Sequence, residues 1–593
     1  MRFFVLLMAA WGLMWLSGCA FEEGNSQDDL YATNQAGLTT YAGDRPNVVR
    51  THLPEEPRSL HPVMTNTADK TYVLTYGFQR LLALDPEGNL MPQLAKELPA
   101  VSADQLTYSF VLDPAARWPD GAPVTAQDVL FSFKALTQNR ALAPYLAPLA
   151  EVTSPEEGIV VVRTQYYDFL NPYIGNYGMI LDRRQFDPEG ALDPYSVAQM
   201  LDPDSEAYQD PVVQQWIEGF TDLELGRNVD LLGTGSGPYR LVSWDANDGI
   251  YLARQKDYWA AGREDFIHAQ HPDTIHFAFM GGDDAALQLK QQTLDVSLFI
   301  GSQTWLDLAN GSPIIEQHFR LDTALTYGLN TMVLNNQPKA EARQPFFVDA
   351  RVRRAVALAL PLREIIADQL GGLAQMTATP VPGDNVFFNA ELKPLPYDRA
   401  QARALLTRAG WVDSNGDGTR DSMIDGERIE FVVDLYRPDA ANAQVQAAVQ
   451  RIKEELQAVG MGVNFTGGSI STFYPQTVQR DFDMGLMLLP AGATPYDFSP
   501  LWHSDAIGGF NMSGYRNAEV DQLITELRRE PDGDLQREKA LRIQEILYRE
   551  MPVVYLFNTY QKSAVHRRFN YDELLPQPPY LPLNTLRMIP VEP

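Results

Sequence analysis

One stretch, residues 72–136, limits the possible folds more than any other part of the chain, because its local signals follow one another in a fixed order. Between 106 and 112, apolar residues alternate with smaller or polar ones, the period-two pattern of a half-buried strand. The sequence Pro119-Asp120-Gly121 then predicts a turn. Thr125 precedes Asp128 by three residues, and this capping box predicts the start of a helix. The apolar face of that helix is expected to contain Val129, Phe133 and Leu136.

The order of these parts resembles the signature region of the family 5 extracellular solute-binding proteins, which supply peptides, and sometimes nickel or sugars, to ABC importers. In that family an aromatic strand leads into a W/F-x-D-G turn, then T-A-x-D-V and an aromatic helix. The matching residues are Trp118, Asp120, Gly121, Thr125, Ala126, Asp128, Val129 and Phe133. The resemblance implies an α/β fold like the type II periplasmic binding proteins: two α/β lobes joined by a two-strand hinge, plus an extra accessory domain.

The resemblance covers about residues 46–575 and sets the expected domain boundaries. Lobe 1 would contain residues 47–66, 231–320 and 552–593, and lobe 2 would contain residues 321–551. The accessory domain would contain residues 67–230, with an insertion near 188–230 relative to the simplest family members. A strand–helix–strand rhythm between residues 429 and 465 separately predicts a parallel α/β lobe.

Composition indicates a large globular protein. The chain has 593 residues, of which 45% are hydrophobic and 21% charged, so several domains are expected. A formal charge of −29 disfavours nucleic acid and anionic membrane surfaces as partners of the protein body. The charge fits a soluble secreted protein, and attraction of cationic ligands is the alternative interpretation.

The first residues have the pattern of a lipoprotein signal peptide. Arg2 is followed by an almost wholly apolar run over residues 3–16, too short to span a bilayer comfortably. Leu16-Ser17-Gly18-Cys19 resembles a bacterial lipobox, which predicts lipid attachment at Cys19, the only cysteine of the chain. We therefore expect a signal peptide at 1–18, a flexible tether at 19–46 and a membrane-anchored protein on the periplasmic or extracytoplasmic side. The alternative is a buried thiol in an N-terminal anchor helix.

Motifs for catalysis are absent from the sequence. It contains no H-E-x-x-H, G-x-S-x-G, C-x-x-C or P-loop pattern, and we predict a binding protein rather than an enzyme. The glycine run at 233–237 precedes a predicted strand rather than a helix, which argues against a phosphate-binding loop. An enzyme remains the alternative if two carboxylates meet in a cleft.

The resemblance also suggests where a ligand would be held. In peptide-binding members an aspartate a few residues before a proline pairs with the free amine of the peptide, but here Ala491 stands at that position. Asp497 would replace it if the loop is shifted. The full set of candidate ligand contacts is His61, Asn335, Ala491, Tyr496, Asp497, Phe498 and Trp502. For the aromatic residues, core packing is the competing interpretation, and for His61 it is an exposed loop position.

One loop has the spacing of a calcium site. Asp413, Asn415, Asp417 and Asp421 occupy positions 1, 3, 5 and 9 of an EF-hand-like loop with a glycine at position 6. Position 12 is Ile424, so the bidentate glutamate is missing. We expect no cofactor, and a structural calcium ion or a plain hairpin turn are the two interpretations of this loop.

The predicted partners are a peptide or other small solute, an ABC permease and a membrane reached through the lipid, with no nucleic acid, and the protein is expected to be a monomer. Two alternatives stay open. The same fold would suit a non-peptide ligand such as a metal chelate or a sugar, or a surface interaction protein or chaperone that has lost transport.

Overall fold

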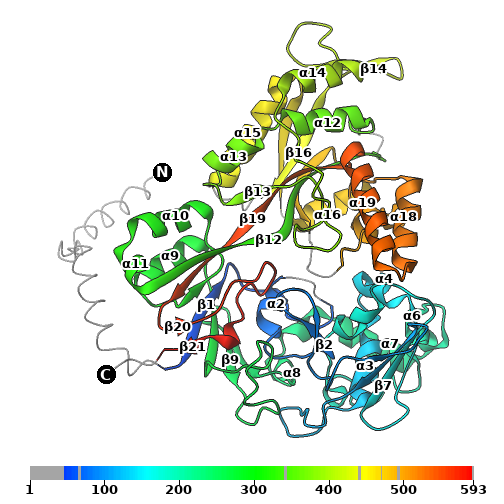
Figure 1. Cartoon of the computed structure of the whole chain (residues 1–593), viewed down its shortest axis with the longest axis vertical. Helices are drawn as coiled ribbons and strands as arrows, with labels where there is room; N and C mark the ends of the chain where they lie inside the picture. Colours follow the sequence, from blue (N-terminus) through cyan, green and yellow to red (C-terminus); the bar gives the residue numbers. More distant parts are fainter. Residues whose placement is uncertain are drawn as a thin grey trace, which may run out of the picture. The chain divides into compact units, whose positions relative to one another are not determined.

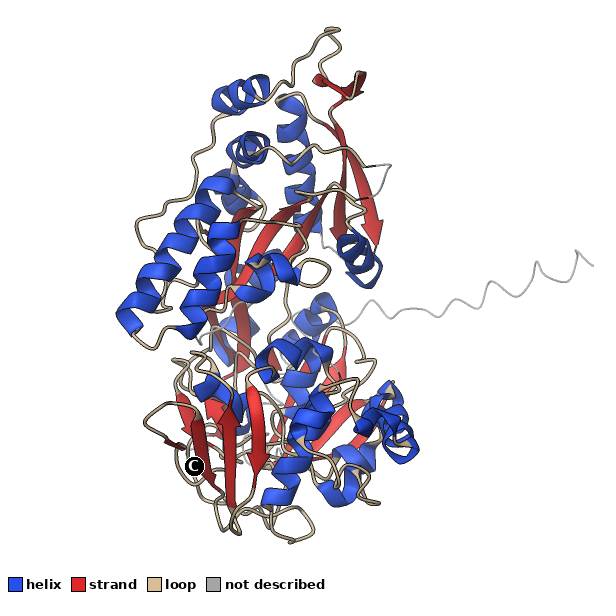
Figure 2. Ribbon diagram, turned by 90° about the vertical axis from the view of Figure 1, so that its right-hand side faces the viewer, coloured by secondary structure: helices blue, strands red, loops and turns tan. Residues whose placement is uncertain are grey.

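The computed structural model describes residues 46–64, 68–339, 343–438, 443–468, 470–489 and 495–589. The predicted signal peptide, the tether up to residue 45, Cys19 and Ala491 lie outside the described residues. Residues 47–588 form one compact unit with helices and strands throughout, which is the mixed α/β structure predicted from the sequence (Figure 2). Within the described ranges, no helix combines the length and the apolar character needed to cross a membrane.

The central element is a seven-stranded sheet built around two long strands, β12 (Phe319–Leu334) and β19 (Val553–His566). They run antiparallel and side by side, from the pair Phe319–His566 to the pair Val333–Val553 (Figure 1). The 16 residues of β12 span about 50 Å at a normal strand rise. The other members are β11 (Val296–Ser297), β13 (Ala374–Met376), β16 (Val432–Pro438), β17 (Gly462–Gly468) and β18 (Met484–Leu489).

The register of the ladder between β12 and β19 shifts twice, between Leu325 and Leu329 and between Asn330 and Thr331. At the first shift, side chains take over the hydrogen bonds. The Asn558 amide donates to the carbonyls of Tyr327 and Gly328, at 3.3 and 3.0 Å. The Thr326 hydroxyl donates to the Thr559 carbonyl at 2.8 Å. Buried backbone groups must be paired, and these substitutes let the two strands continue past the irregularity.

The parallel α/β part predicted from residues 429–465 is confirmed. Strand β16 is parallel to both β17 and β18, and the connections are helices α15 (Ala443–Ala458) and α16 (Ile470–Gln479). Helices between residues 350 and 550 also include α12 (Ala350–Ala359), α13 (Leu362–Asp368), α14 (Arg399–Arg408), α18 (Ala518–Arg529) and α19 (Gly533–Glu550).

A second sheet contains β1 (Val48–Leu53), β10 (Thr274–Phe279), β9 (Gly249–Arg254) and β8 (Tyr239–Asp245), in that order. Helices α9 (Gly282–Lys290), α10 (Ser302–Gly311) and α11 (Pro313–His318) follow β10 along the chain. Strand β1 pairs in parallel with β10, more than 200 residues away in sequence. The first described strand is therefore hydrogen-bonded to a strand from the middle of the chain.

The accessory region, residues 67–230, contains an antiparallel sheet of β4 (Ala100–Val101), β5 (Thr107–Val111), β7 (Ile159–Thr164) and β6 (Leu149–Thr153). Short helix α2 (Ala68–Leu74) and the pair β2 (Leu82–Leu84) and β3 (Leu90–Pro92) precede it. The insertion consists of short helices, among them α6 (Val197–Leu201) and α7 (Pro211–Thr221). One continuous buried core contains Val49, Phe110 and Tyr239, so it joins this region to the predicted lobe 1, and the boundaries between the two stay predictions.

The capping box is present at the start of α3 (Ala126–Leu136). The Thr125 hydroxyl accepts from the Asp128 amide, while the Asp128 carboxylate accepts from the Thr125 amide at 2.8 Å. The other Asp128 oxygen accepts from the Arg183 amide at 3.0 Å, which attaches the insertion side of the region to the helix. Val129, Phe133 and Leu136 are all buried, as the sequence predicts.

We expect Thr125→Ala to lower the free energy of unfolding by about 1 kcal/mol, because it removes one half of the capping box. Urea titration followed by circular dichroism measures the loss. Gln127→Ala is the matched control, since Gln127 is exposed in the same first turn. Equal stability of the two variants would contradict a stabilising role for the cap.

Candidate functional site

Residues 495–502, where the sequence places most of the ligand contacts, form part of a buried core. Tyr496, Phe498 and Trp502 are 6%, 0% and 1% exposed, and all three belong to one cluster that includes residues from α18 and α19. Helix α17 (Ser499–Trp502) holds this segment in place. The burial of the aromatic residues favours core packing, the competing interpretation of the sequence, and their contact with a ligand stays a prediction.

Asp497 differs from its aromatic neighbours. One carboxylate oxygen accepts from the Ser499 amide at 2.9 Å, but the other, Oδ2, is buried and has no hydrogen-bond partner among the described residues. Its charge acts on Tyr145, whose pKa is raised by burial and by the nearby carboxylate. An unpaired buried carboxylate oxygen is costly, so this atom is suited to accept a hydrogen bond from a ligand.

Arg528 of α18 connects the accessory region to residues 321–551. Its Nε and Nη2 atoms each lie 2.7 Å from the Asp168 carboxylate, and its carbonyl accepts from the Phe169 amide at 3.0 Å. Burial raises the pKa of Asp168, and the Arg528 charge opposes part of that rise. The next residue, Arg529, lies over the Tyr166 ring at 3.3 Å. Two consecutive arginines of α18 thus bind segment 166–170 of the accessory region.

Apolar contacts reinforce this connection. Phe169 and Leu170 are 5% and 6% exposed and belong to the same cluster as Trp502. The Phe169 ring lies 6.1 Å from that of Phe387, edge to face. Asp168 and Arg528 were not predicted from the sequence, since 360 residues separate them and neither belongs to a motif.

A cavity of about 310 Å³ lies at this junction. Tyr166 and Asp168 line it from the accessory region, and Ser499, His503 and Arg528 line it from the other side. A larger cavity of about 490 Å³ lies beside the interruption in β12 and is lined by Tyr327, Asn558 and residues of the segment 375–394. Both volumes are in the range of small-molecule sites. The smaller cavity lies between the accessory region and residues 499–529, and ligand sites often lie where two parts of a protein meet.

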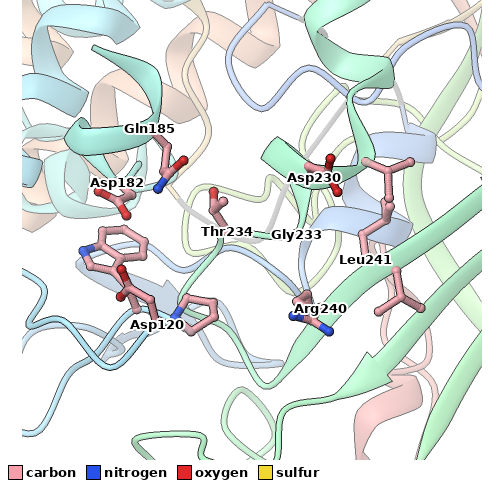
Figure 3. Close-up of a pocket in the computed structure, with 12 residues that line it drawn as sticks. Asp120, Asp182, Gln185, Asp230, Gly233, Thr234, Arg240 and Leu241 are labelled. Atoms are coloured by element: carbon pink, nitrogen blue, oxygen red, sulfur yellow. The ribbon is translucent and has the colours of Figure 1, made fainter. Parts of the chain in front are cut away.

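A third cavity, about 390 Å³, lies at the signature turn (Figure 3). Figure 3 shows Asp120 and Asp182 on one side of it and Arg240 on the other. Arg184 binds both of these carboxylates, at 2.8 Å to Asp120 and 2.6 Å to Asp182. Because this arginine holds both acids in ion pairs, the arrangement supports a structural role for the turn.

The structure places two further predicted ligand contacts in buried positions. His61 is completely buried: its Nε2 donates to the Phe220 carbonyl at 2.6 Å, and its Nδ1 accepts from the amides of Val63 and Met64. Asn335 is 2% exposed, and its amide donates to the carbonyls of Arg480 and Phe482. Both side chains satisfy backbone groups of distant segments, which supports structural roles, and their predicted contact with a ligand stays a prediction.

In the loop with calcium-site spacing, the acidic side chains accept hydrogen bonds from the loop itself. Asp413 accepts from the amides of Gly416, Asp417 and Gly418, and Asp421 accepts from Ser414. Asn415 donates to Asp417 at 2.6 Å. The loop joins into the hairpin β14 (Asp421–Ile424) and β15 (Glu427–Glu430). In the described part of the chain, no three histidine, cysteine or acidic residues are grouped as a metal site would need, and the arrangement favours the hairpin interpretation.

Comparison with known proteins identifies the family. Residues 89–509 match the model of the bacterial extracellular solute-binding proteins, family 5. The chain belongs to this family. An oligopeptide-binding protein, AppA of Bacillus subtilis, is 23% identical over 92% of this chain and 91% of its own length. The nickel-binding periplasmic protein of Escherichia coli is 23% identical over 76% of each chain.

Solved structures agree on the fold. The B. subtilis AppA structure, in complex with a nonapeptide, has a TM-score of 0.72 and 19% identity, and it covers 91% of this chain and 99% of its own. The family 5 resemblance and the predicted type II periplasmic-binding-protein fold are thus confirmed. As a family 5 member, the chain is a solute-binding protein of a kind found outside the cytoplasm.

The Asp168–Arg528 pair should behave as a buried ion pair. Asp168→Asn or Arg528→Gln alone leaves a buried charge without its partner, and each is expected to cost about 3 kcal/mol in the free energy of unfolding. The double variant should cost clearly less than the sum, as measured by urea titration in a double-mutant cycle. The exposed pair Arg542–Glu519 is the control and should contribute less than about 1 kcal/mol. A coupling energy as small as the control's would rule out the buried pair.

Burial of His61 makes stability depend on pH. Desolvation lowers the pKa of His61 from 6.5 to about 4, so the folded state holds the ring neutral while the unfolded state takes up a proton. The contribution of the neutral His61 ring to the free energy of unfolding is complete above pH 6.5. As pH falls from 6.5 to about 4, the free energy of unfolding should decrease by about 2–3 kcal/mol.

Thermal unfolding at several pH values should therefore show a smaller loss over this interval in His61→Gln than in the wild type. His276→Gln is the control, because His276 lies at the surface stacked on Tyr251. The same acid sensitivity in His61→Gln and the wild type would show that another group is responsible.

Proposed function

We propose that this chain captures a peptide or peptide-like solute outside the cytoplasm and delivers it to an ABC permease. Family membership supports solute binding, and the oligopeptide-binding relative supports the choice of ligand class. The chain would be held at the membrane by lipid on Cys19, as a monomer, and capture would involve no covalent step. The nickel-binding relative keeps a metal chelate as the second ligand class.

The observation that carries the proposal is the junction at Arg528. Asp168 in the accessory region and Arg528 in α18 form a buried pair that crosses from one side of a cavity to the other. Such a pair forms only when the two sides meet, so it would stabilise a closed state around a bound solute. Ser499 joins the same group through a longer contact with Arg528, at 3.4 Å.

Asp497 supplies the chemistry for recognising a free amine. Its buried Oδ2 has no hydrogen-bond partner among the described residues, and a protonated amine would supply one and would add its charge to that of Arg528, which already acts on this carboxylate. This position lies later than the aspartate of peptide-binding family members, which fits the shifted loop considered from the sequence. A peptide would therefore be held by its amino terminus near α17.

The first test is native mass spectrometry of the purified mature protein. A ladder of peptide masses released on denaturation supports peptide capture. A single metal chelate or sugar overturns the peptide assignment and leaves solute binding intact. Release of no small molecule, together with no binding of a peptide library, would favour a surface interaction protein.

The second test concerns Asp497. Asp497→Asn should weaken the binding of a short peptide with a free amino terminus at least tenfold, measured by calorimetry, because the opposite charge is lost. Binding of the N-acetylated peptide should be equally weak in the wild type and the variant. Asp505→Asn is the control, since Asp505 lines the junction cavity beside Ser499 and its side chain is 94% exposed. Unchanged affinity of Asp497→Asn for the free-amine peptide would exclude this role.

A further inference from the structure

A small cavity on another part of the molecule contains an arginine without a partner among the described residues. The cavity has a volume of about 250 Å³. Its walls come from α2 and the turn after it, the β2–β3 segment, Asn176, residues 266–267 and the C-terminal segment 575–584. None of the residues proposed to hold the solute lines it, so a role for this cavity is independent of the proposed function.

Arg80 is the only basic residue that lines this cavity. Its backbone is fixed on both sides: the amide donates to the Gln93 side chain at 2.8 Å, and the carbonyl accepts from the Leu94 amide at 3.0 Å. Its guanidinium makes no ion pair or hydrogen bond with any described residue, and Nε is fully shielded from solvent. Burial lowers the pKa of Arg80, as expected for a charge held away from water without a counter-ion.

Three more hydrogen-bond donors face the same space. Thr71 and Thr75 both line the cavity. They are four residues apart, so they lie on the same side of the helix. The helical hydrogen bonding extends past the end of α2, because the Phe78 amide donates to the Leu74 carbonyl. Asn176 lines the cavity from the end of the 3-10 helix Asn171–Asn176. No described residue is hydrogen-bonded to the hydroxyls of Thr71 and Thr75 or to the Asn176 amide.

One negative charge lies in the cavity lining. Asp85 is the one acidic residue in the lining, and its two carboxylate oxygens accept from the backbone amide and the side chain of Asn89, at 2.7 and 3.0 Å. A second cation, Lys70, lies close to Arg80, and burial together with the Arg80 charge lowers the pKa of Lys70 to about 8. Arg80 and Lys70 together outnumber the one acidic residue of the lining, in a chain with a formal charge of −29.

We propose that the Arg80 cavity binds a small oxyanion, a carboxylate or a phosphate. A guanidinium offers five donors in a planar fork that matches two oxygens of such a group. The threonine hydroxyls and the Asn176 amide would donate to the remaining oxygens. An unpaired arginine in a partly buried site destabilises the fold, and a bound anion would offset that cost by supplying the missing counter-charge. The volume limits the ligand to a few carbon atoms beside the charged group.

Isothermal titration of the purified chain with succinate and, separately, with inorganic phosphate tests the proposal, with chloride at equal ionic strength as the reference. We expect at least one of the two anions to bind, and its affinity to fall at least tenfold in Arg80→Gln. The anion that binds identifies the class of ligand. Binding of neither anion by the wild type, or equal affinity in Arg80→Gln, overturns the proposal.

The stability of the variant provides an independent readout. In the absence of an anion, Arg80→Gln should unfold at the same temperature as the wild type or higher, because it removes an unpaired charge. The anion should raise the unfolding temperature of the wild type but not of the variant. Arg163→Gln, at an exposed position of β7, is the control for general loss of positive charge and should respond like the wild type.

A double variant covers the case in which Arg80→Gln does not fold. Thr75→Val combined with Asn176→Ala keeps the charge and removes two of the neutral donors. A tenfold or greater loss of anion affinity in this variant supports the cavity as the site, and unchanged affinity overturns it. Loss of anion binding in either variant leaves the peptide test at Asp497 unaffected, so the two proposals fail separately.

Discussion

Backbone hydrogen bonding between β12 and β19 is the constraint on which the other parts of the structure depend. The four buried core clusters each take residues from this pair of strands: Phe319, Leu329, Met332 and Val565 belong to four different clusters. A register slip of one residue would turn each of these side chains to the opposite face of the sheet. The longer of its two interruptions, at residues 325–329, is tolerated because the side chains of Asn558 and Thr326 pair the backbone groups that the ladder leaves.

Local chemistry made residues 72–136 predictable. The alternation at 106–112 became a strand with Tyr108, Phe110 and Leu112 buried, and the capping box at Thr125 began the helix expected there. These signals involve residues at most a few positions apart, so they act in much the same way in any context. The same reasoning identified the family, because the order of local elements is what family members share.

Site residues were harder to predict because their roles depend on distant backbone. His61 and Asn335 stand at positions that suggest ligand contact, yet each satisfies groups 145 or more residues away in sequence. The aromatic residues of 495–502 fill a core whose other half comes from α18 and α19. Conversely, Asp168 and Arg528 carry no local signal, and only the fold brings them together. Sequence patterns therefore indicate which residues can bind a ligand, and tertiary structure decides which of them are free to do so.

Arg528 and Arg80 illustrate that difference with one type of side chain. The fold supplies Arg528 with the Asp168 carboxylate, so its charge is compensated inside the protein and contributes to the contact between two regions. No acid among the described residues forms an ion pair with Arg80, although carboxylates outnumber cations in this chain by 76 to 47. With so many acids available, pairing Arg80 would need only one substitution nearby. A guanidinium left unpaired among free hydroxyl and amide donors is instead complementary to an anion from outside, and the cavity provides the space for one.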